Sequence, residues 1–202
     1  MSTPTLRWIP SVLASDERQR AVAALSTTER ARFGYEPLAK RETFLAGRHL
    51  LRSLAGDLLG LDAADVPLIA SCPDCHREHG RPLIEGTDLH VSLAHSADAV
   101  VAVAAWGARV GVDLEPAGTK VDDLAPLIRT PSLHRWTRIE AVLKADGRGL
   151  RVSPDLVEFA TTADGDIGWV PDAPARYRVW EVDLDPAVRV SVALELDVPG
   201  RP

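Results

Sequence analysis

The chain has 202 residues, of which 46% are hydrophobic and 26% are charged; this composition excludes a chain disordered throughout, and no apolar run reaches the roughly 20 residues that span a bilayer. The formal net charge of −6 argues against a general nucleic-acid binder, because such a protein needs cations that neutralise phosphates. The N-terminus lacks the apolar run of a secretory signal and only two cysteines are present, so we expect a cytoplasmic globular protein.

Helical signals come first along the chain. Residues 15–33 have apolar positions at helical spacing, interrupted where Ser26 and Glu29 form a capping box that predicts a second helix start. Residues 38–60 form the clearest helix, with one apolar face and a terminal Gly60. Three arginines lie near its other side: Arg41, Arg48 and Arg52.

Strands are predicted after a loop that contains Cys72, Cys75 and the run from His79 to Pro82. Residues 89–93 alternate apolar and polar side chains, and the continuous apolar run 99–105 is typical of a strand buried on both faces. Residues 110–115 read as a third strand after a tight link. The segment 116–132 is rich in Pro, Gly and Asp and predicts a loop with at most a short helix near residues 124–128.

The second half repeats this order of elements. A helix is predicted at about residues 134–146, ended by Gly147 and Gly149, and strand pairs at 156–170 and 176–196. Both halves therefore run from helix through loop to strands. We expect an α+β fold of two similar lobes, residues 1–108 and 109–202.

Two pairs of charged side chains are candidates for chemistry. Asp113 and Glu115 are two apart in a predicted strand, so both carboxylates point to one face, either as a solvated strand end or as a site for a hard cation such as Mg²⁺. Glu140 and Lys144 are four apart on a predicted helix. They read either as a surface ion pair or as a ligand or base beside a phosphate-binding lysine.

Three basic side chains have equally open interpretations. His95 ends a predicted strand and is either a hydrogen-bonded structural residue or a catalyst. Arg41 and Arg48 form either a solvated helix face or an anion site.

The cysteine loop has ligand-like spacing at Cys72, Cys75, His76 and His79. A single Cys-x-x-Cys without a distant second pair is a weaker signal than a zinc ribbon, and the adjacent Cys75 and His76 rarely both reach one ion. From the spacing alone we do not expect zinc here.

The joint pattern is more specific than its parts. The runs at 79–82 (His-Gly-Arg-Pro), 89–96 (ending Ala-His-Ser), 110–115 (Val-Gly-Val-Asp-Leu-Glu) and 136–144 (Trp-Thr-Arg-Ile-Glu-Ala-Val-Leu-Lys) follow in order. Together with the helix around residues 44–52 and the final strands, they resemble the Sfp-type 4′-phosphopantetheinyl transferases, over nearly the whole chain.

The resemblance implies a pseudo-dimer of two α+β lobes, with coenzyme A and Mg²⁺ in the cleft between them. It implies Asp113, Glu115 and Glu140 as metal ligands, with Glu140 also the candidate base. By the same resemblance Lys144, His95 and Arg48 contact phosphates of coenzyme A. The implied reaction is transfer of 4′-phosphopantetheine to a serine of an acyl or peptidyl carrier protein, in lipid synthesis or secondary metabolism.

Three departures from the family pattern stand out. Ile139 occupies a position where the family usually has lysine, and Ala94 one where it usually has serine. Only 24 residues separate Glu115 from Glu140, which shortens the segment 116–132 relative to the family. These changes leave a second interpretation open: a divergent member that binds coenzyme A or a carrier domain without efficient transfer, or that performs other chemistry on a carrier-bound substrate.

The expected partners include carrier proteins, which are usually acidic. The resemblance implies coenzyme A and a carrier protein, with no role for nucleic acid or a membrane, and an internal pseudo-dimer has no need of a second chain, so we expect a monomer. Basic side chains could dock an acidic carrier helix, or simply be solvated: Arg135, Arg138, Arg148 and Arg151.

Overall fold

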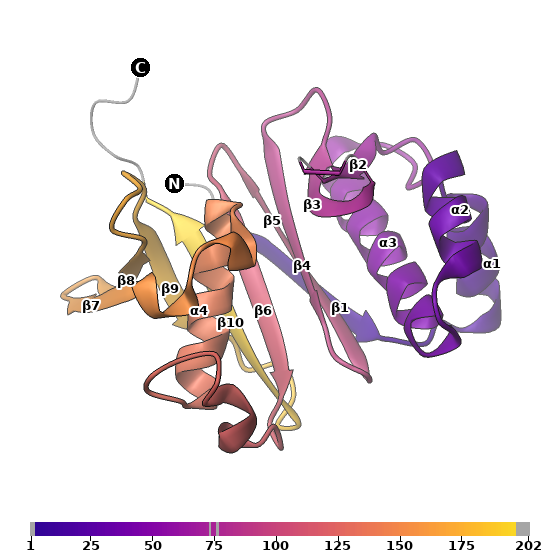
Figure 1. Ribbon diagram of the computed structural model, residues 1–202. Helices are drawn as coiled ribbons and strands as arrows, with labels where there is room; N and C mark the ends of the chain where they lie inside the picture. Colours follow the sequence, from indigo (N-terminus) through magenta and orange to yellow (C-terminus); the bar gives the residue numbers. More distant parts are fainter. Residues whose placement is uncertain (1–2, 73, 76, 197–202) are drawn as a thin grey trace.

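The computed structural model describes residues 3–72, 74–75 and 77–196, and it stacks helices and sheets in four layers (Figure 1). The helices are α1 (Ser15–Ala23), α2 (Thr27–Tyr35), α3 (Leu38–Leu59) and α4 (Leu133–Asp146). Short 3₁₀ turns are η1 (Val121–Leu124), η2 (Gly149–Arg151) and η3 (Pro154–Leu156). The strands are β1 (Thr5–Pro10), β2 (Leu68–Ser71), β3 (Glu78–Ile84), β4 (Leu89–His95), β5 (Ala99–Trp106), β6 (Val110–Pro116), β7 (Glu158–Thr162), β8 (Gly165–Trp169), β9 (Tyr177–Glu181) and β10 (Val188–Glu195). The mixed α/β composition agrees with the expected class.

The strands form two larger antiparallel sheets and one hairpin. The first sheet has the order β1-β5-β4, the second β6-β10-β9-β8-β7, and β2 pairs with β3. Helix α3 packs on one side of the first sheet with α1 and α2 packed against it, and α4 packs on the outer side of the second sheet (Figure 1). The inner sides of the two sheets face each other across a shared apolar core.

Strand β5 explains why the sequence has an uninterrupted apolar run there. Val100, Ala102 and Ala104 face the core under α1–α3. The alternate residues Val101 and Val103 face the core between the sheets. Since successive side chains of a strand point to opposite faces, burial on both faces requires apolar residues at every position.

The predicted capping box at the start of α2 is confirmed, and it has a second role. The Ser26 hydroxyl accepts a hydrogen bond from the Glu29 backbone N–H (3.2 Å), and the Glu29 carboxylate accepts one from the Ser26 N–H (2.9 Å). Glu29 is only 1% exposed and also pairs with Arg48 (3.2 Å) and Arg52 (2.5 Å) of α3. The interpretation of Arg48 as part of a solvated helix face is therefore wrong, because the buried Glu29 carboxylate pairs with it and with Arg52.

Two strand regions were not expected from the sequence. Strand β1 has no clear alternation of apolar and polar residues, and it forms by pairing with β5, from Thr5 opposite Ala104 to Pro10 opposite Ala99. The region between α3 and β4 is not simply a loop, since β2 and β3 pair there with a register shift between Ile69 and Ser71. Short strands that depend on non-local pairing leave a weak local signal.

The segment 116–132 is anchored to the core by two apolar side chains in its interior. Its helical turn is the 3₁₀ turn η1, slightly earlier in the chain than the predicted helix. Leu124 and Ile128 are 4% and 2% exposed and pack with residues of α4.

A close approach at Gly111 fixes α4 on β6. A Cβ atom at this position would lie 2.0 Å from the Ala141 carbonyl oxygen and 2.5 Å from the Ala145 nitrogen. Real Cβ atoms do not approach backbone so closely, so only glycine lets the helix lie this near the strand. The flanking residues Val110 and Val112 point away from α4 into the core between the sheets.

Gly111→Ala should lower the free energy of unfolding by about 1–3 kcal/mol, because the added methyl group forces α4 away from β6. Urea denaturation followed by circular dichroism measures this change. Gly118→Ala is the matched control, since a Cβ there meets nothing within 4 Å. Equal stability of the two variants would contradict the argument.

Candidate functional site

The contact of α4 with β6 brings three carboxylates together. Asp113 and Glu115 lie on the side of β6 that faces α4, two and four residues after Gly111 in the same strand. Glu140 comes from α4 and interacts electrostatically with both. The structure thus brings together the three side chains that the sequence predicted as metal ligands.

Lys144 contacts Asp113 rather than Glu140. The Lys144 Nζ donates to Asp113 Oδ1 at 2.7 Å, and the Asp113 side chain is only 8% exposed. The predicted surface pair of Glu140 with Lys144 is therefore replaced by a partly buried pair between helix and strand.

Of the three carboxyl groups, Glu140 has the pKa that is raised furthest above its ordinary value. Burial, followed by repulsion from Asp113, raises the pKa of Glu140 to about 7, against an attraction by Lys144 that lowers it. Burial also raises the pKa of Glu115, although the Trp136 indole N–H donates to Glu115 Oε1 at 3.1 Å. Carboxylates crowded in this way lack sufficient positive charge.

The donor set fits a hard divalent cation. Asp113 Oδ2 and Glu140 Oε1 are buried and have no hydrogen-bond partner among the described residues. Buried acceptors without donors are costly, and Mg²⁺ prefers carboxylate oxygens. Asp113, Glu115 and Glu140 are thus the residues that could hold such an ion.

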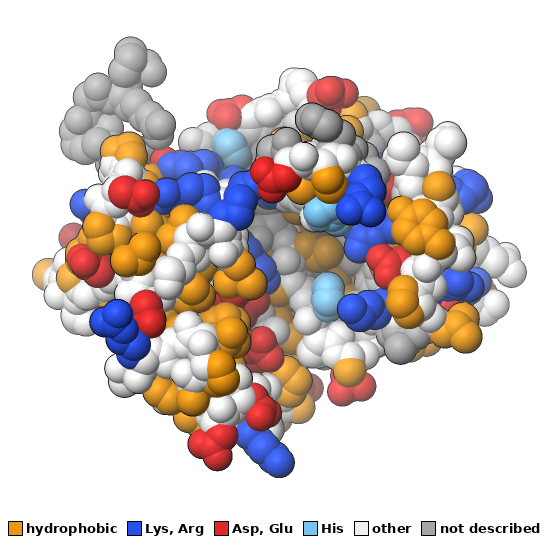
Figure 2. All heavy atoms as spheres, in the orientation of Figure 1, with side chains coloured by type: hydrophobic (Ala, Val, Ile, Leu, Met, Phe, Trp, Pro, Cys, Tyr) orange, Lys and Arg blue, Asp and Glu red, His pale blue; other side chains and the backbone are white. Residues whose placement is uncertain are grey.

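Two neighbouring pockets share part of their lining, and one of them reaches Lys144, the partner of Asp113. One, of about 720 Å³, is lined by Lys144 and Gly147 from the second half of the chain and by Arg81 and Ser92 from the first. The other, of about 590 Å³, is lined by His95, Lys40 and Arg48. His79, Gly80, Pro82 and Leu93 line both pockets. Figure 2 shows this side of the molecule hollowed in the middle, with basic and histidine side chains around the rim.

His95 lies at the end of β4 next to the carboxylate cluster. Partial desolvation, followed by the positive charge of Lys144, lowers the pKa of His95. Lys40, at the start of α3, also acts on it. His95 therefore lies where the pocket, Lys144 and Asp113 meet, which agrees with a ligand-facing role.

The two candidate arginines of α3 have different surroundings. Arg41 donates to the carbonyl oxygens of Gly34 (3.0 Å) and Glu36 (3.2 Å), so it caps the end of α2. Arg48 lines the smaller pocket, but it is 6% exposed and paired with Glu29. Arg41 and Arg48 therefore do not form a joint anion site in this structure.

Arg81 is a pocket residue that sequence reasoning missed as a separate candidate. Its Nη1 donates to the Ala145 carbonyl at 3.4 Å, while Nε and Nη2 are buried without a partner among the described residues. Burial lowers the pKa of Arg81. The quoted run of residues 79–82 contained this residue, but only the fold places it in the larger pocket.

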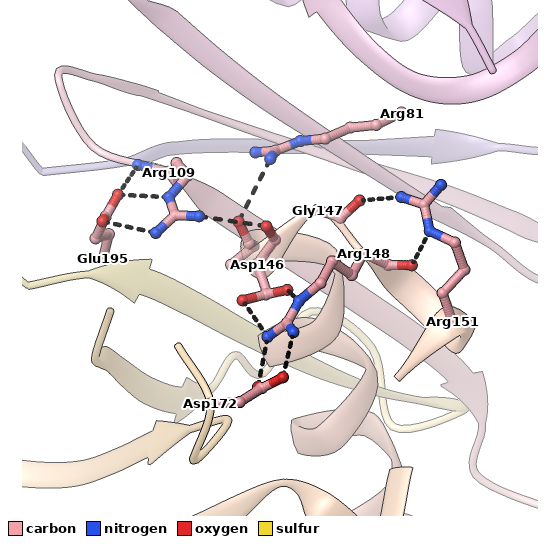
Figure 3. Close-up of polar contacts among 9 residues, drawn as sticks. Arg81, Arg109, Asp146, Gly147, Arg148, Arg151, Asp172 and Glu195 are labelled. Atoms are coloured by element: carbon pink, nitrogen blue, oxygen red, sulfur yellow. Dashed lines mark hydrogen bonds and ion pairs between the residues drawn. The ribbon is translucent and has the colours of Figure 1, made fainter. Parts of the chain in front are cut away.

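Arginines converge on the carboxyl end of α4 (Figure 3). The carbonyls of Ala145, Asp146 and Gly147 accept from Arg81, Arg109 and Arg151, respectively. Cations at a helix C-terminus satisfy carbonyls that have no partner within the helix. Arg81 ties this end of α4 to the hairpin β2–β3, and Arg109 ties it to Glu195 of β10.

The basic side chains considered for carrier docking mostly have acidic partners. Arg138 pairs with Asp166 (2.7 Å), and Arg151 pairs with Asp74 (3.1 Å). Arg148 pairs with both Asp146 (2.5 Å) and Asp172 (2.9 Å). These arginines are neither a free basic patch nor simply solvated helix ends.

Two family departures prove to be core positions. Ile139 is fully buried (0% exposed) in the core under α4. Ala94 is 3% exposed in the core between the sheets. In this chain the Ile139 side chain is part of the apolar core between α4 and the second sheet.

The cysteine loop forms a third cluster, apart from the carboxylates. Ligand atoms of Cys72, Cys75 and His79 all lie within 4.8 Å of one another. Hydrogen bonding to Arg77, and then to His79, lowers the pKa of the Cys75 thiol to about 6. The predicted fourth member, His76, lies outside the described residues.

Glu140→Gln should stabilise the metal-free protein, by on the order of 1 kcal/mol at pH 8, because it removes a charge from the crowded cluster. The Glu140 pKa is raised from 4.5 to about 7, so between these values the folded state binds more protons than the unfolded state. Wild-type stability therefore falls relative to the variant as pH rises through this window. Denaturation at pH 5 and pH 8 measures the difference, with Glu158→Gln on β7 as control. If the difference in unfolding free energy between Glu140→Gln and the wild type is no larger at pH 8 than at pH 5, the prediction is wrong.

Ile139→Lys should lower the free energy of unfolding by at least about 3 kcal/mol, because it buries an ammonium group without a partner. Thermal and urea denaturation measure the loss. Ile139→Leu keeps the volume and should cost less than about 1.5 kcal/mol. A lysine variant as stable as the leucine variant would show that the side chain reaches the pocket.

Comparisons with known proteins place the chain among transferases. No protein-family model matches it. A 4′-phosphopantetheinyl transferase of Bacillus subtilis is 26% identical over 90% of this chain and 88% of its own length, and the Sfp protein of B. subtilis strain 168 is 24% identical over 89% and 86%. A phosphopantetheinyl transferase of Thraustochytrium is 28% identical over 87% of this chain and 72% of its own length. The chain is thus similar over most of its length to 4′-phosphopantetheinyl transferases, including Sfp, as expected of a divergent Sfp-type member.

Proposed function

We propose that this chain is an enzyme that transfers 4′-phosphopantetheine from coenzyme A to a serine of an acyl or peptidyl carrier protein, with Mg²⁺ as cofactor. The observation that carries the proposal is the convergence of Asp113, Glu115 and Glu140 beside Lys144, at a pocket lined from both halves of the chain. The names of the similar proteins support the reaction class.

The cation would be held by the three carboxylates. When bound, it neutralises charge on the pyrophosphate oxygens of coenzyme A. The buried Asp113 Oδ2 and Glu140 Oε1 without partners support this assignment, because each needs a positive or donating group.

The reaction exchanges one phosphorus–oxygen bond for another. The serine oxygen forms a bond to the β-phosphorus of coenzyme A, and the bond from this phosphorus to the 3′,5′-adenosine bisphosphate oxygen breaks. Glu140, with its raised pKa, is suited to take the serine proton near neutral pH. Lys144 would move from Asp113 to the departing phosphate and offset its charge.

The pockets offer space for the nucleotide. His95 and Lys40 line the smaller one and would contact phosphate, while Arg81 has unpartnered donors in the larger one. Arg48 lies at the smaller pocket while paired with Glu29, so Glu29 offsets part of its positive charge toward a bound phosphate. Residues 1–108 and 109–202 would act as the two lobes of a pseudo-dimer, with coenzyme A between them.

The location, oligomeric state and pathway of the protein are further expectations. No helix within the described ranges is long and apolar enough to cross a membrane. Cytoplasmic location, a monomeric state, and lipid synthesis or secondary metabolism as the setting stay predictions. A divergent member that binds coenzyme A or a carrier without efficient transfer, or that performs other chemistry on a carrier-bound substrate, remains the competing hypothesis.

Incubation of apo carrier proteins with this protein, coenzyme A and Mg²⁺ should add the mass of phosphopantetheine to the carrier, as measured by mass spectrometry. Glu140→Ala should lower the rate by at least about 10²-fold, the contribution expected of a positioned proton acceptor. Glu158→Ala, an exposed change on β7, should keep the wild-type rate. Binding of coenzyme A without mass gain on any carrier would favour the competing hypothesis.

A further inference from the structure

The cysteine loop lies at the turn of the hairpin β2–β3, away from the three carboxylates. Its three candidate ligands come from both ends of the turn: Cys72 directly after β2, Cys75 within the turn, and His79 in β3. Their ligand atoms lie within 4.8 Å of one another, although the residues span eight positions of the chain.

The hairpin backbone explains this convergence. The Cys72 N–H donates to the Arg77 carbonyl (2.9 Å), which also accepts from the His79 N–H (2.9 Å). At Gly80 the strands approach so closely that a Cβ would lie 2.3 Å from the Ser71 carbonyl oxygen. A glycine beside His79 therefore lets β3 cross close to Cys72, and the two side chains meet without help from a bound group.

We propose that Cys72, Cys75 and His79 form a zinc site, with the fourth tetrahedral position open to water or another ligand. Zinc bonds of about 2.3 Å to sulfur and 2.0–2.1 Å to nitrogen place tetrahedral ligand atoms roughly 3.3–3.8 Å apart. The observed cluster needs only small side-chain movements to reach this geometry. Binding would release the thiol protons and leave the oxidation state of every atom unchanged.

The geometry overrides the argument from spacing. That argument requires Cys75 and the adjacent His76 to share one ion, whereas the fold supplies His79 instead, with its Nε2 2.8 Å from the Cys75 sulfur. Cys72 is buried (7% exposed), as expected of an internal ligand, while Cys75 is exposed to an incoming ion.

The position of the site indicates what zinc would do. His79 and Gly80 line both pockets, and the hairpin is otherwise tied to the second half of the chain through Arg81 to Ala145 and Asp74 to Arg151. Only two strands pair in this hairpin, and such a hairpin is marginally stable by itself. Zinc would fix its turn and hold this pocket wall, a structural role that does not depend on the proposed transfer reaction.

Elemental analysis of the purified, metal-depleted full chain after equilibration with zinc and gel filtration should give about one zinc per chain. Cys75→Ser and His79→Ala should each reduce zinc affinity at least tenfold, given the roughly 10–100-fold cost of even outer-shell changes. His134→Ala removes a histidine of α4 and should leave zinc binding unchanged. Because the chain has only two cysteines, thiol modification of the zinc-loaded protein should release all bound zinc.

Cobalt substitution provides a readout independent of folding and of enzyme activity. Co²⁺ should produce the intense visible absorption of a tetrahedral site with a thiolate-to-cobalt band, and zinc should displace it. The proposal is overturned if wild-type protein retains no zinc, if His79→Ala binds as wild type, or if the protein is lighter by two hydrogens because Cys72 and Cys75 form a disulfide.

Discussion

The close packing of α4 on β6 is the constraint on which the rest of the structure depends. Without a side chain at Gly111, the helix backbone lies against the strand, and the next residues on that face, Asp113 and Glu115, lie under Glu140. The apolar cores on both sides of the second sheet hold this arrangement. Burial of apolar side chains thus offsets the electrostatic repulsion among the three carboxylates. Without that packing, the carboxylates would move apart.

The negative charges of the three carboxylates near this contact are only partly neutralised by the protein. Lys144 is shared between Asp113 and the pocket, and the arginines at the end of α4 fix the helix without neutralising the carboxylates. A raised Glu140 pKa and unpartnered carboxylate oxygens are the expected result. Such a site gains stability when a cation and a phosphate arrive together, because each supplies the charge that the other lacks.

Local sequence signals predicted much of the fold but not its long-range contacts. The capping box at Ser26, the glycine ends of α3 and α4, and the apolar run of β5 are read from neighbouring residues, and each is confirmed. The two-residue spacing placed Asp113 and Glu115 on one face. The hairpin β2–β3, the burial of Arg48 by Glu29 and the inward orientation of Ile139 depend on residues distant in the chain, so no local pattern reveals them.

The central claim is that the three carboxylates form one cation site that makes coenzyme A binding depend on Mg²⁺. Isothermal titration calorimetry of coenzyme A, with and without Mg²⁺, tests it directly in the wild type, Asp113→Ala and the exposed control Asp185→Ala. The account predicts Mg²⁺-dependent binding in the wild type and the control, and none in Asp113→Ala. Undiminished Mg²⁺-dependent binding by Asp113→Ala would contradict it.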